Sequence, residues 1–165
     1  MKSLLAKLGV ILIGLAIFGC AHERGAKQPD GFMGMNWGES IEQCKEKRLC
    51  VKIEPTEDNV TMATGVGSSI GDMVGVQVEY FFGENKLGAV IVQFNGKKDF
   101  DSLLMASKEK YGEPKSEEPL KNIYGNEIGI QINWEMSNVA INIKYNLISG
   151  EGRLTYSYKP ILREQ

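Results

Sequence analysis

The sequence predicts an α+β fold in which antiparallel β-sheet packs against two helices, in the order helix–strands–helix–strands. Several segments alternate apolar and polar side chains with the period of a half-buried strand, and two others have apolar residues at helical spacing. Short turn-forming stretches separate the strand segments, which favours antiparallel hairpins. Because strictly alternating strands bury one face only, we expect the helices to cover that face.

The first half of the domain begins with a capped helix. Ser40 is the predicted N-cap, and Gln43 three residues later completes a capping box for a short helix that ends near Arg48. The Gly-rich stretch 65–75 is predicted to be a loop between strands, with contact to a ligand as the alternative. The strand segments of this half are residues 50–53, 60–64, 76–82 and 86–94, and the last is apolar on both faces, which predicts cover on both sides.

The second half repeats this order. Asp99 is the predicted cap of a helix whose apolar stripe is Phe100, Leu103, Leu104 and Tyr111, and Gly112 and Pro114 end it. The polar stretch 113–126 is predicted to be a loop. The strand segments that follow are residues 128–134, 139–145 and 154–158, and Trp134 continues an apolar face that points to the core.

The N-terminus has the three parts of a secretory signal. Lys2 and Lys7 provide a basic start, residues 8–18 form an apolar run, and a small residue, Gly19, precedes Cys20. A membrane-spanning helix needs about twenty apolar residues. This run is shorter and polar residues follow it at once, so we expect an export signal rather than a permanent transmembrane helix.

The segment Ile17–Cys20 resembles the lipobox of bacterial lipoprotein precursors. The resemblance implies that residues 1–19 are removed and that Cys20 becomes the lipid-bearing first residue, with two or three acyl chains that hold it in a bilayer. Ala21, where an Asp would retain an enterobacterial lipoprotein in the inner membrane, implies the outer membrane, facing the periplasm. The alternative is that Cys20 merely ends an ordinary signal.

The chain therefore divides into a signal peptide (1–19), a lipidated cysteine with a flexible polar tether (20–31) and a single α+β domain (32–165). Removing the signal takes away two lysines and no acid, which changes the formal net charge from −2 to −4. A chain of this charge offers no broad basic face, so we expect no nucleic-acid partner.

Cys44 and Cys50 are predicted to form a disulfide. Exported domains sit in an oxidising compartment, and the chain reverses between the end of the short helix and the following strand. That reversal can bring the two Cα atoms to the roughly 4.4–6.8 Å that a bridge requires. Two separately buried thiols, or a redox or metal pair, are the alternatives.

The sequence lacks a recognisable catalytic constellation, and we predict no catalytic residue, no metal ligand and no cofactor. His22, the single histidine, lies in the tether, which argues against Ser–His, Cys–His and most zinc mechanisms. Ser107 and Lys110 have the offset of some Ser–Lys hydrolases without the companion motifs, and are predicted to be a solvated helix face. The scattered carboxylates leave a paired acid and base open.

Tyr156 and Tyr158 share one face of the last strand segment. They are predicted either to pack under a helix or to form a surface where a partner docks. The order of elements is similar to that of small helix-and-meander lipoproteins, such as the barrel-assembly accessory lipoproteins, and of tandem-repeat inhibitor domains. The stretch Trp37-Gly38-Glu39-Ser40 resembles the WG-x-S start of small bacterial exported proteins without assigned activity. These resemblances concern shape and imply no functional residue.

Together these features predict a membrane-anchored, non-catalytic binding or scaffolding module of the cell envelope, with an envelope protein as partner. One alternative is a carrier of a small apolar ligand, for which an internal cavity of a few hundred cubic ångströms between sheet and helices would be the sign. The other is a carboxylate-dependent envelope hydrolase, which would need two acids converging in a cleft.

Overall fold

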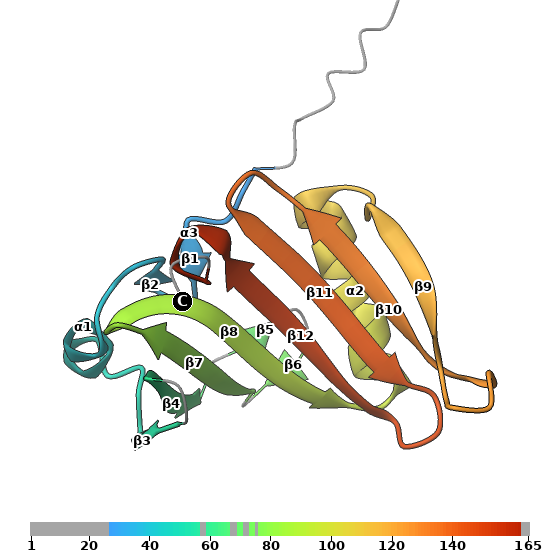
Figure 1. The fold of residues 1–165 in the computed structure, drawn as a ribbon, viewed down its shortest axis with the longest axis horizontal. Helices are drawn as coiled ribbons and strands as arrows, with labels where there is room; N and C mark the ends of the chain where they lie inside the picture. Colours follow the sequence, from blue (N-terminus) through green and yellow to red (C-terminus); the bar gives the residue numbers. More distant parts are fainter. Residues whose placement is uncertain (1–26, 57–58, 67–68, 71–72, 75, 163–165) are drawn as a thin grey trace, which may run out of the picture.

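A computed structural model describes residues 27–56, 59–66, 69–70, 73–74 and 76–162. Its main feature is one antiparallel eight-stranded sheet in the order β3-β4-β7-β8-β12-β11-β10-β9 (Figure 1). The strands are β3 Lys52–Pro55, β4 Val60–Val66, β7 Gln77–Gly83, β8 Lys86–Asn95, β9 Ser116–Lys121, β10 Glu127–Glu135, β11 Val139–Asn146 and β12 Glu151–Tyr158.

The sheet consists of two four-stranded meanders joined side by side. The first runs from β3 to β8 and the second from β9 to β12, and they meet where β8 pairs with β12, from Asn95 opposite Glu151 to Ala89 opposite Ser157. Two short strand pairs lie outside this sheet: β1 Gly31–Phe32 with β2 Met35–Asn36, and β5 Ser69–Ile70 with β6 Met73–Val74. The predicted α+β class with antiparallel strands is therefore confirmed.

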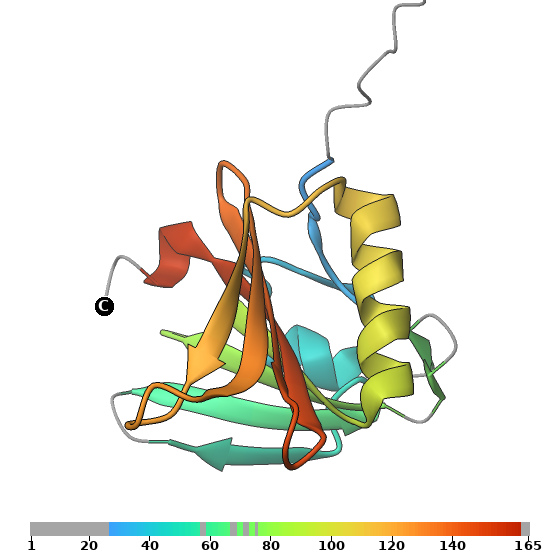
Figure 2. The same cartoon turned by 90° about the vertical axis from the view of Figure 1, so that its right-hand side faces the viewer.

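The helices contribute unequally. α2, Lys97–Tyr111, lies across one face of the sheet (Figure 2). α1, Ile41–Glu46, lies beside the β7–β8 turn, where the Ile41 backbone N–H donates to Asn85. α3, Lys159–Leu162, follows β12 and packs against β8 and β12. The predicted helix–strands–helix–strands order is not confirmed, because β1 and β2 precede α1 and α3 ends the described chain.

Alternation along the strands separates a buried face from an uncovered one. β11 shows it most simply: Val139, Ile141, Ile143 and Tyr145 are buried, and the residues between them are partly exposed. Leu154 of β12 and Ile132 of β10 lie opposite Ile143 in the same buried row. The core thus lies between this face and α2, and the other face presents mainly polar side chains.

Two strand predictions were wrong because burial differs from what the sequence pattern implied. β8 is not covered on both faces, since Ile91 is only partly buried and Gln93 is exposed. The predicted loop 113–126 contains β9, which pairs with β10 at the edge of the sheet. β9 has no alternating pattern because most of its residues are exposed, and charged residues and a proline such as Pro119 are typical of edge strands.

The predicted helix cap at Asp99 was also wrong. Gly96 occupies the N-cap position with φ of 92° and no side-chain cap, and α2 begins at Lys97. The chain passes directly from β8 into α2 here, and glycine adopts this left-handed conformation without steric cost. Asp99 lies within the first turn, where its negative charge favours the positive end of the helix dipole.

Part of the predicted tether and of the predicted Gly-rich loop is folded. Pro29 is buried, and its carbonyl accepts a hydrogen bond of 2.8 Å from the Trp37 indole. β4 continues to Val66, and β5 and β6 pair with one another. The signal segment 1–19, Cys20 and His22 lie outside the described residues.

Candidate functional site

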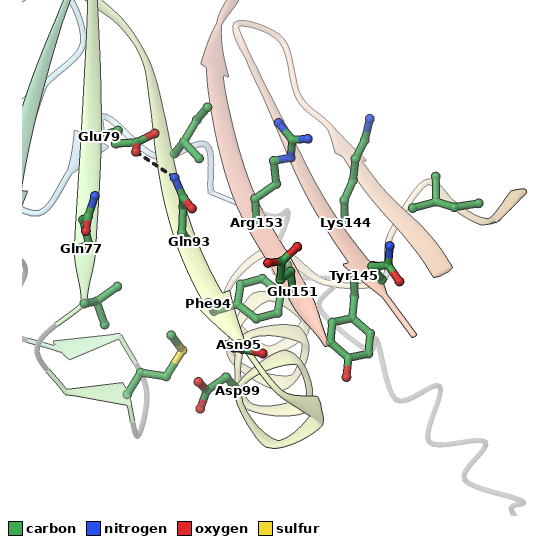
Figure 3. Close-up of a pocket in the computed structure, with 16 residues that line it drawn as sticks. Gln77, Glu79, Gln93, Phe94, Asn95, Asp99, Lys144, Tyr145, Glu151 and Arg153 are labelled. Atoms are coloured by element: carbon green, nitrogen blue, oxygen red, sulfur yellow. Dashed lines mark hydrogen bonds between the residues drawn. The ribbon is translucent and has the colours of Figure 1, made fainter. Parts of the chain in front are cut away.

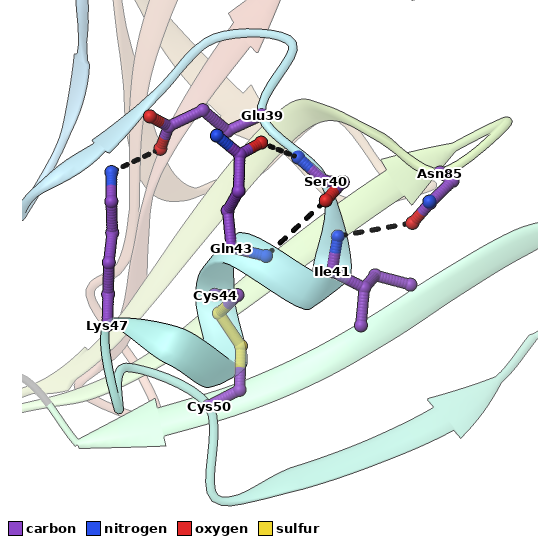
Figure 4. The surroundings of a disulfide bond; sticks show 8 residues. All are labelled: Glu39, Ser40, Ile41, Gln43, Cys44, Lys47, Cys50 and Asn85. Atoms are coloured by element: carbon purple, nitrogen blue, oxygen red, sulfur yellow. Dashed lines mark hydrogen bonds and ion pairs between the residues drawn. A yellow bond between two sulfur atoms is a disulfide. The ribbon is translucent and has the colours of Figure 1, made fainter.

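The disulfide between Cys44 and Cys50 is present, with a Cα–Cα distance of 5.7 Å (Figure 4). It joins α1 to the segment that leads into β3. The Ser40 capping box is confirmed too: the Ser40 hydroxyl accepts from the Gln43 backbone, and the Gln43 side chain accepts from the Ser40 backbone. Both features fix α1 at the edge of the sheet, and we assign them a structural role.

Glu39 is held in its charged form beside α1. The Lys47 ammonium donates to its carboxylate at 2.5 Å (Figure 4). The Asn36 backbone N–H donates to the same carboxylate at 3.0 Å. The Lys47 hydrogen bond, followed by the Asn36 backbone bond, lowers the pKa of Glu39 from 4.5 to about 2. This carboxylate therefore stays ionised at neutral pH and ties α1 to β2, which makes it a poor general acid or base.

A groove of about 1060 Å³ lies at one end of the sheet (Figure 3). We call it the distal groove. The strands β7, β8, β11 and β12 provide most of its lining, with contributions from β6, α2 and β9. Its lining residues are Met73, Val76, Gln77, Glu79, Ile91, Gln93, Phe94, Asn95, Asp99, Leu120, Lys144, Tyr145, Asn146, Glu151, Gly152 and Arg153.

Two cationic side chains lie next to one another in the distal groove. Lys144 of β11 and Arg153 of β12 are direct cross-strand neighbours, and Figure 3 shows both side chains projecting from the same face of the sheet. Like charges in this arrangement destabilise a sheet. Across the part of the chain that is described, neither cation forms an ion pair. The pair is therefore available to an external carboxylate or other anion.

Polar neighbours extend this cationic pair into a row. Gln131 lies opposite Lys144, and Gln93 lies opposite Arg153. Gln93 donates a hydrogen bond of 2.8 Å to Glu79, which fixes both side chains on the groove floor (Figure 3). Amide and guanidinium groups in one line can donate several hydrogen bonds to an extended ligand.

Exposed apolar side chains flank the distal groove at the tips of two hairpins. Ile123 and Tyr124, in the β9–β10 turn, are 92% and 82% exposed, and Leu147 and Ile148, in the β11–β12 turn, are also exposed. The Leu147 N–H donates to the carbonyl of Ile128 near the start of β10, so the two turns lie at the same end of the sheet. Large apolar side chains clustered this way mark an interaction surface more often than isolated ones do.

These tips lie at the end of the sheet opposite the N-terminal segment. The Gln28 side chain accepts a hydrogen bond of 2.7 Å from the Asn138 backbone, in the β10–β11 turn. β11 separates that turn from the β11–β12 turn, and at about 3.4 Å per residue its eight residues span roughly 24 Å. Figure 1 shows the first described residues, from Lys27 onward (blue), near one end of β11 and the two hairpin turns at the other.

Tyr156 does not form the predicted partner surface. It is 5% exposed and lies in the core, where the Tyr111 hydroxyl donates to it at 3.3 Å. Burial, followed by the neighbouring Tyr111, raises the pKa of Tyr156 well above 10, so its hydroxyl stays protonated. Tyr158 is partly buried and stacks on Trp37 with ring centroids 5.8 Å apart. Packing under a helix, the other prediction for this pair, describes Tyr156, which contacts Tyr111 of α2, but not Tyr158. Trp134 is buried as predicted.

A second, smaller cavity of about 280 Å³ lies between α2, the sheet and the strands β1 and β5. Ser107 and Lys110 both line it. The prediction that these two residues form a solvated helix face was wrong for Ser107, which is 4% exposed, because α2 turns this side toward the sheet. We call this space the helix cavity.

The described residues contain no cluster of three or more His, Cys, Asp or Glu placed to hold a metal ion. Within the same residues, no helix is both long and apolar enough to cross a membrane. Comparison with protein-family models, with curated proteins and with solved structures finds no match to this chain.

Sequence reasoning missed the residues of the distal groove. The strand predictions depended on apolar positions, whereas Lys144 occupies an intervening polar position of 139–145 and Arg153 directly precedes the predicted segment 154–158. The alternation itself predicts that they share a face with other polar residues. Their pairing depends on the β11–β12 register, which the turn between the strands sets and which a strand pattern alone does not reveal.

Proposed function

We propose that this chain is a lipid-anchored, non-catalytic binding protein of the bacterial cell envelope, held by Cys20 in the outer membrane and facing the periplasm. The signal-like N-terminus and the lipobox-like Ile17–Cys20 support the anchor. The distal groove, with its cationic pair and apolar hairpin tips, is the observation that carries the binding role.

The arrangement of the domain suits an anchored binding protein. The first described residues contact the β10–β11 turn through Gln28, and the groove and tips lie at the opposite end of β11. A lipid on Cys20 would therefore leave the distal groove pointing away from the membrane surface. The partner it would meet there is a soluble or membrane-embedded protein of the envelope.

The chemistry of the distal end defines the partner more closely. Protein interfaces combine a central apolar patch with a polar rim. Here Ile123, Tyr124, Leu147 and Ile148 provide exposed apolar area. Lys144 and Arg153 provide a positive pair without an ion pair to any described residue, in a groove that three carboxylates also line. We infer a protein partner that places an acidic side chain against the pair and apolar side chains against the tips.

The anchor is tested by the intact mass of the protein extracted from membranes. We expect a chain that begins at residue 20 and carries the added mass of a diacylglyceryl and an acyl group. Cys20→Ala should lose this modification and the stable membrane association, because the thiol is the attachment point. A mass that retains residues 1–19, or a cut elsewhere with Cys20 unmodified, would reject the lipoprotein proposal.

The binding surface is tested by photo-crosslinking in bacterial cells that express the full chain. Benzoylphenylalanine replaces Ile148 at the distal tip in one variant and Met105, which is 72% exposed on α2, in the control. We expect a defined adduct from position 148 and none from position 105. Adding Lys144→Glu and Arg153→Glu should abolish the adduct, because two anions would repel the partner's acid.

The matched control for this charge reversal is Lys98→Glu. Lys98 is an exposed residue of α2, and it forms no ion pair with any described residue. It should leave the adduct unchanged. Equal crosslinking from positions 148 and 105, or an adduct insensitive to Lys144→Glu and Arg153→Glu, would reject the distal groove as the binding surface.

Carriage of a small apolar ligand is the second candidate function, and a separate observation favours it. The helix cavity has the position and approximately the size expected for such a site, between α2 and the sheet. Ligand pockets span about 300–1,000 Å³, so this cavity suits a small molecule. It can coexist with the distal groove, because none of its lining residues lines the groove.

A further inference from the structure

The helix cavity has apolar walls drawn from four different elements. Phe32 of β1, Ile70 of β5, Leu103 of α2 and Leu154 of β12 are among the residues that line it. Leu103 and Leu154 are each 1% exposed. Walls of this kind favour the part of a ligand that water solvates poorly.

Hydrogen-bond donors lie on one side of this apolar space. Ser107 is 96% buried, given its exposed fraction of 4%, and its hydroxyl makes no hydrogen bond with any described residue. Tyr111 and Tyr156 share a single hydrogen bond, although each hydroxyl carries a proton. Two hydroxyl protons therefore lack an acceptor among the described residues. Because no buried side-chain N or O atom of these residues is without a partner, the unbonded Ser107 oxygen is accessible from the cavity, where a ligand could supply the acceptor.

The charge of the lining indicates what that acceptor is. Lys110 lies one helical turn beyond Ser107, on the same side of α2, and it is the single charged residue that lines the helix cavity. It is exposed, and it forms no ion pair within the described ranges; its ammonium lies 5.3 Å from the centre of the Tyr111 ring. No carboxylate lines the cavity. A negatively charged head group would thus meet one cation and no opposing charge.

We infer that the helix cavity binds a small amphipathic monocarboxylate. Its apolar part lies among the leucine, isoleucine and phenylalanine side chains, and its carboxylate accepts from Ser107 and the tyrosine pair near Lys110. The volume is about twice that of the engineered cavity that holds benzene, which corresponds to about twelve non-hydrogen atoms. The inference rests on the carrier candidate above and is independent of the distal groove and its partner.

Calorimetry and amide chemical shifts of the complete mature chain, residues 20–165, test this site. The chain carries Cys20→Ser, so that neither lipid nor detergent competes for the cavity. Decanoate and 4-propylbenzoate, each with about twelve non-hydrogen atoms, distinguish a flexible alkyl ligand from an aromatic one. We expect saturable binding of one of them, with shifts concentrated in α2 and β12. Decylamine, of similar length and opposite charge, should bind at least tenfold more weakly.

Variants then locate the ligand. Ala106→Leu fills the cavity and should weaken binding at least tenfold, whereas Met105→Leu, on the exposed side of α2, should leave it unchanged. Ser107→Ala should weaken carboxylate binding about tenfold, the effect of losing a buried hydrogen bond to a charged group. Lys110→Gln should weaken it about two- to fivefold, as for an exposed ion pair.

The inference would be overturned if neither carboxylate binds at concentrations below that at which decanoate forms micelles. It would also be overturned if Ala106→Leu keeps a native amide spectrum and binds the carboxylate as well as the wild type does. Lys110→Gln tests the site even if Ala106→Leu does not fold, because Lys110 is exposed. Ala106→Leu should not alter the crosslink from position 148, so failure of the cavity and failure of the distal groove are separate results.

Discussion

At the scale of single residues, Glu39 gives the protein a specific dependence on pH. Its pKa of about 2 in the folded protein lies below the ordinary value of 4.5 because Lys47 and the Asn36 backbone donate to the charged carboxylate. A group with a depressed folded-state pKa stabilises the fold fully above its unfolded-state pKa. That stabilisation is lost as the pH falls from about 4.5 towards 2.

We expect Glu39→Gln to flatten this part of the acid unfolding profile. The free energy of unfolding, measured in urea at pH 6 and pH 3, should fall less for the variant than for the wild type, because the amide does not titrate. Glu46→Gln, in the last turn of α1, is the matched control and should keep the wild-type slope. Identical slopes for wild type and Glu39→Gln would contradict the assignment.

Gly65 shows how a single residue of the Gly-rich stretch serves the fold. It lies in β4, and a Cβ atom there would collide with the backbone carbonyl of Leu49 and approach the Tyr80 ring to 3.0 Å. Glycine is required because another segment of backbone approaches it closely. This explains a residue that the sequence alone placed in a loop.

At the scale of elements, the disulfide stabilises a short helix that cannot be stable alone. α1 has six residues, far fewer than the dozen or more that an isolated helix needs. The bridge, the Ser40 cap and the contacts with Asn85 hold it at the edge of the sheet. Closing so short a loop stabilises a protein by about 2–3 kcal/mol in the chain-entropy description.

Reduction of the wild-type protein should therefore lower the free energy of unfolding by about 2–3 kcal/mol, measured by urea titration with and without reductant. The double variant Cys44→Ala, Cys50→Ala should show no response to reductant, because no bridge remains to break. A wild-type protein whose urea midpoint does not change with reductant would argue against a stabilising bridge.

At the scale of the whole molecule, the β8–β12 pairing unites the two meanders into one structure. Seven residue pairs join these strands, and the buried rows of the sheet continue across them from Ile132 through Leu154 to Val78. A core that crosses the junction without interruption favours one cooperative unfolding transition.

We expect urea unfolding curves from far-ultraviolet circular dichroism and from tryptophan fluorescence to coincide. Thr155→Pro, in the middle of the junction, should destabilise both halves together, because proline cannot donate to the sheet and β12 is a central strand. Pro119 in the edge strand β9 is tolerated for the opposite reason. Two separate transitions in the wild type would mean that the meanders fold independently.

The sequence by itself determined the antiparallel α+β class, the capped first helix, the strands with regular alternation and the residues able to form the disulfide. These depend on local signals: side-chain period, cap chemistry and the separation of two cysteines. The predicted export signal and lipid anchor depend on local pattern as well, and they stay predictions.

Tertiary structure decided what local signals do not encode. β9 is a strand because β10 offers it a partner, Tyr156 is buried because α2 lies over it, and α2 starts at a glycine because β8 ends there. Lys144 lies beside Arg153 because of the β11–β12 register. Ser107 lines the same cavity as Tyr111 and Tyr156 because of the placement of α2 on the sheet. Both candidate sites arise from contacts between residues distant in sequence, and such contacts depend on the packing of the whole chain.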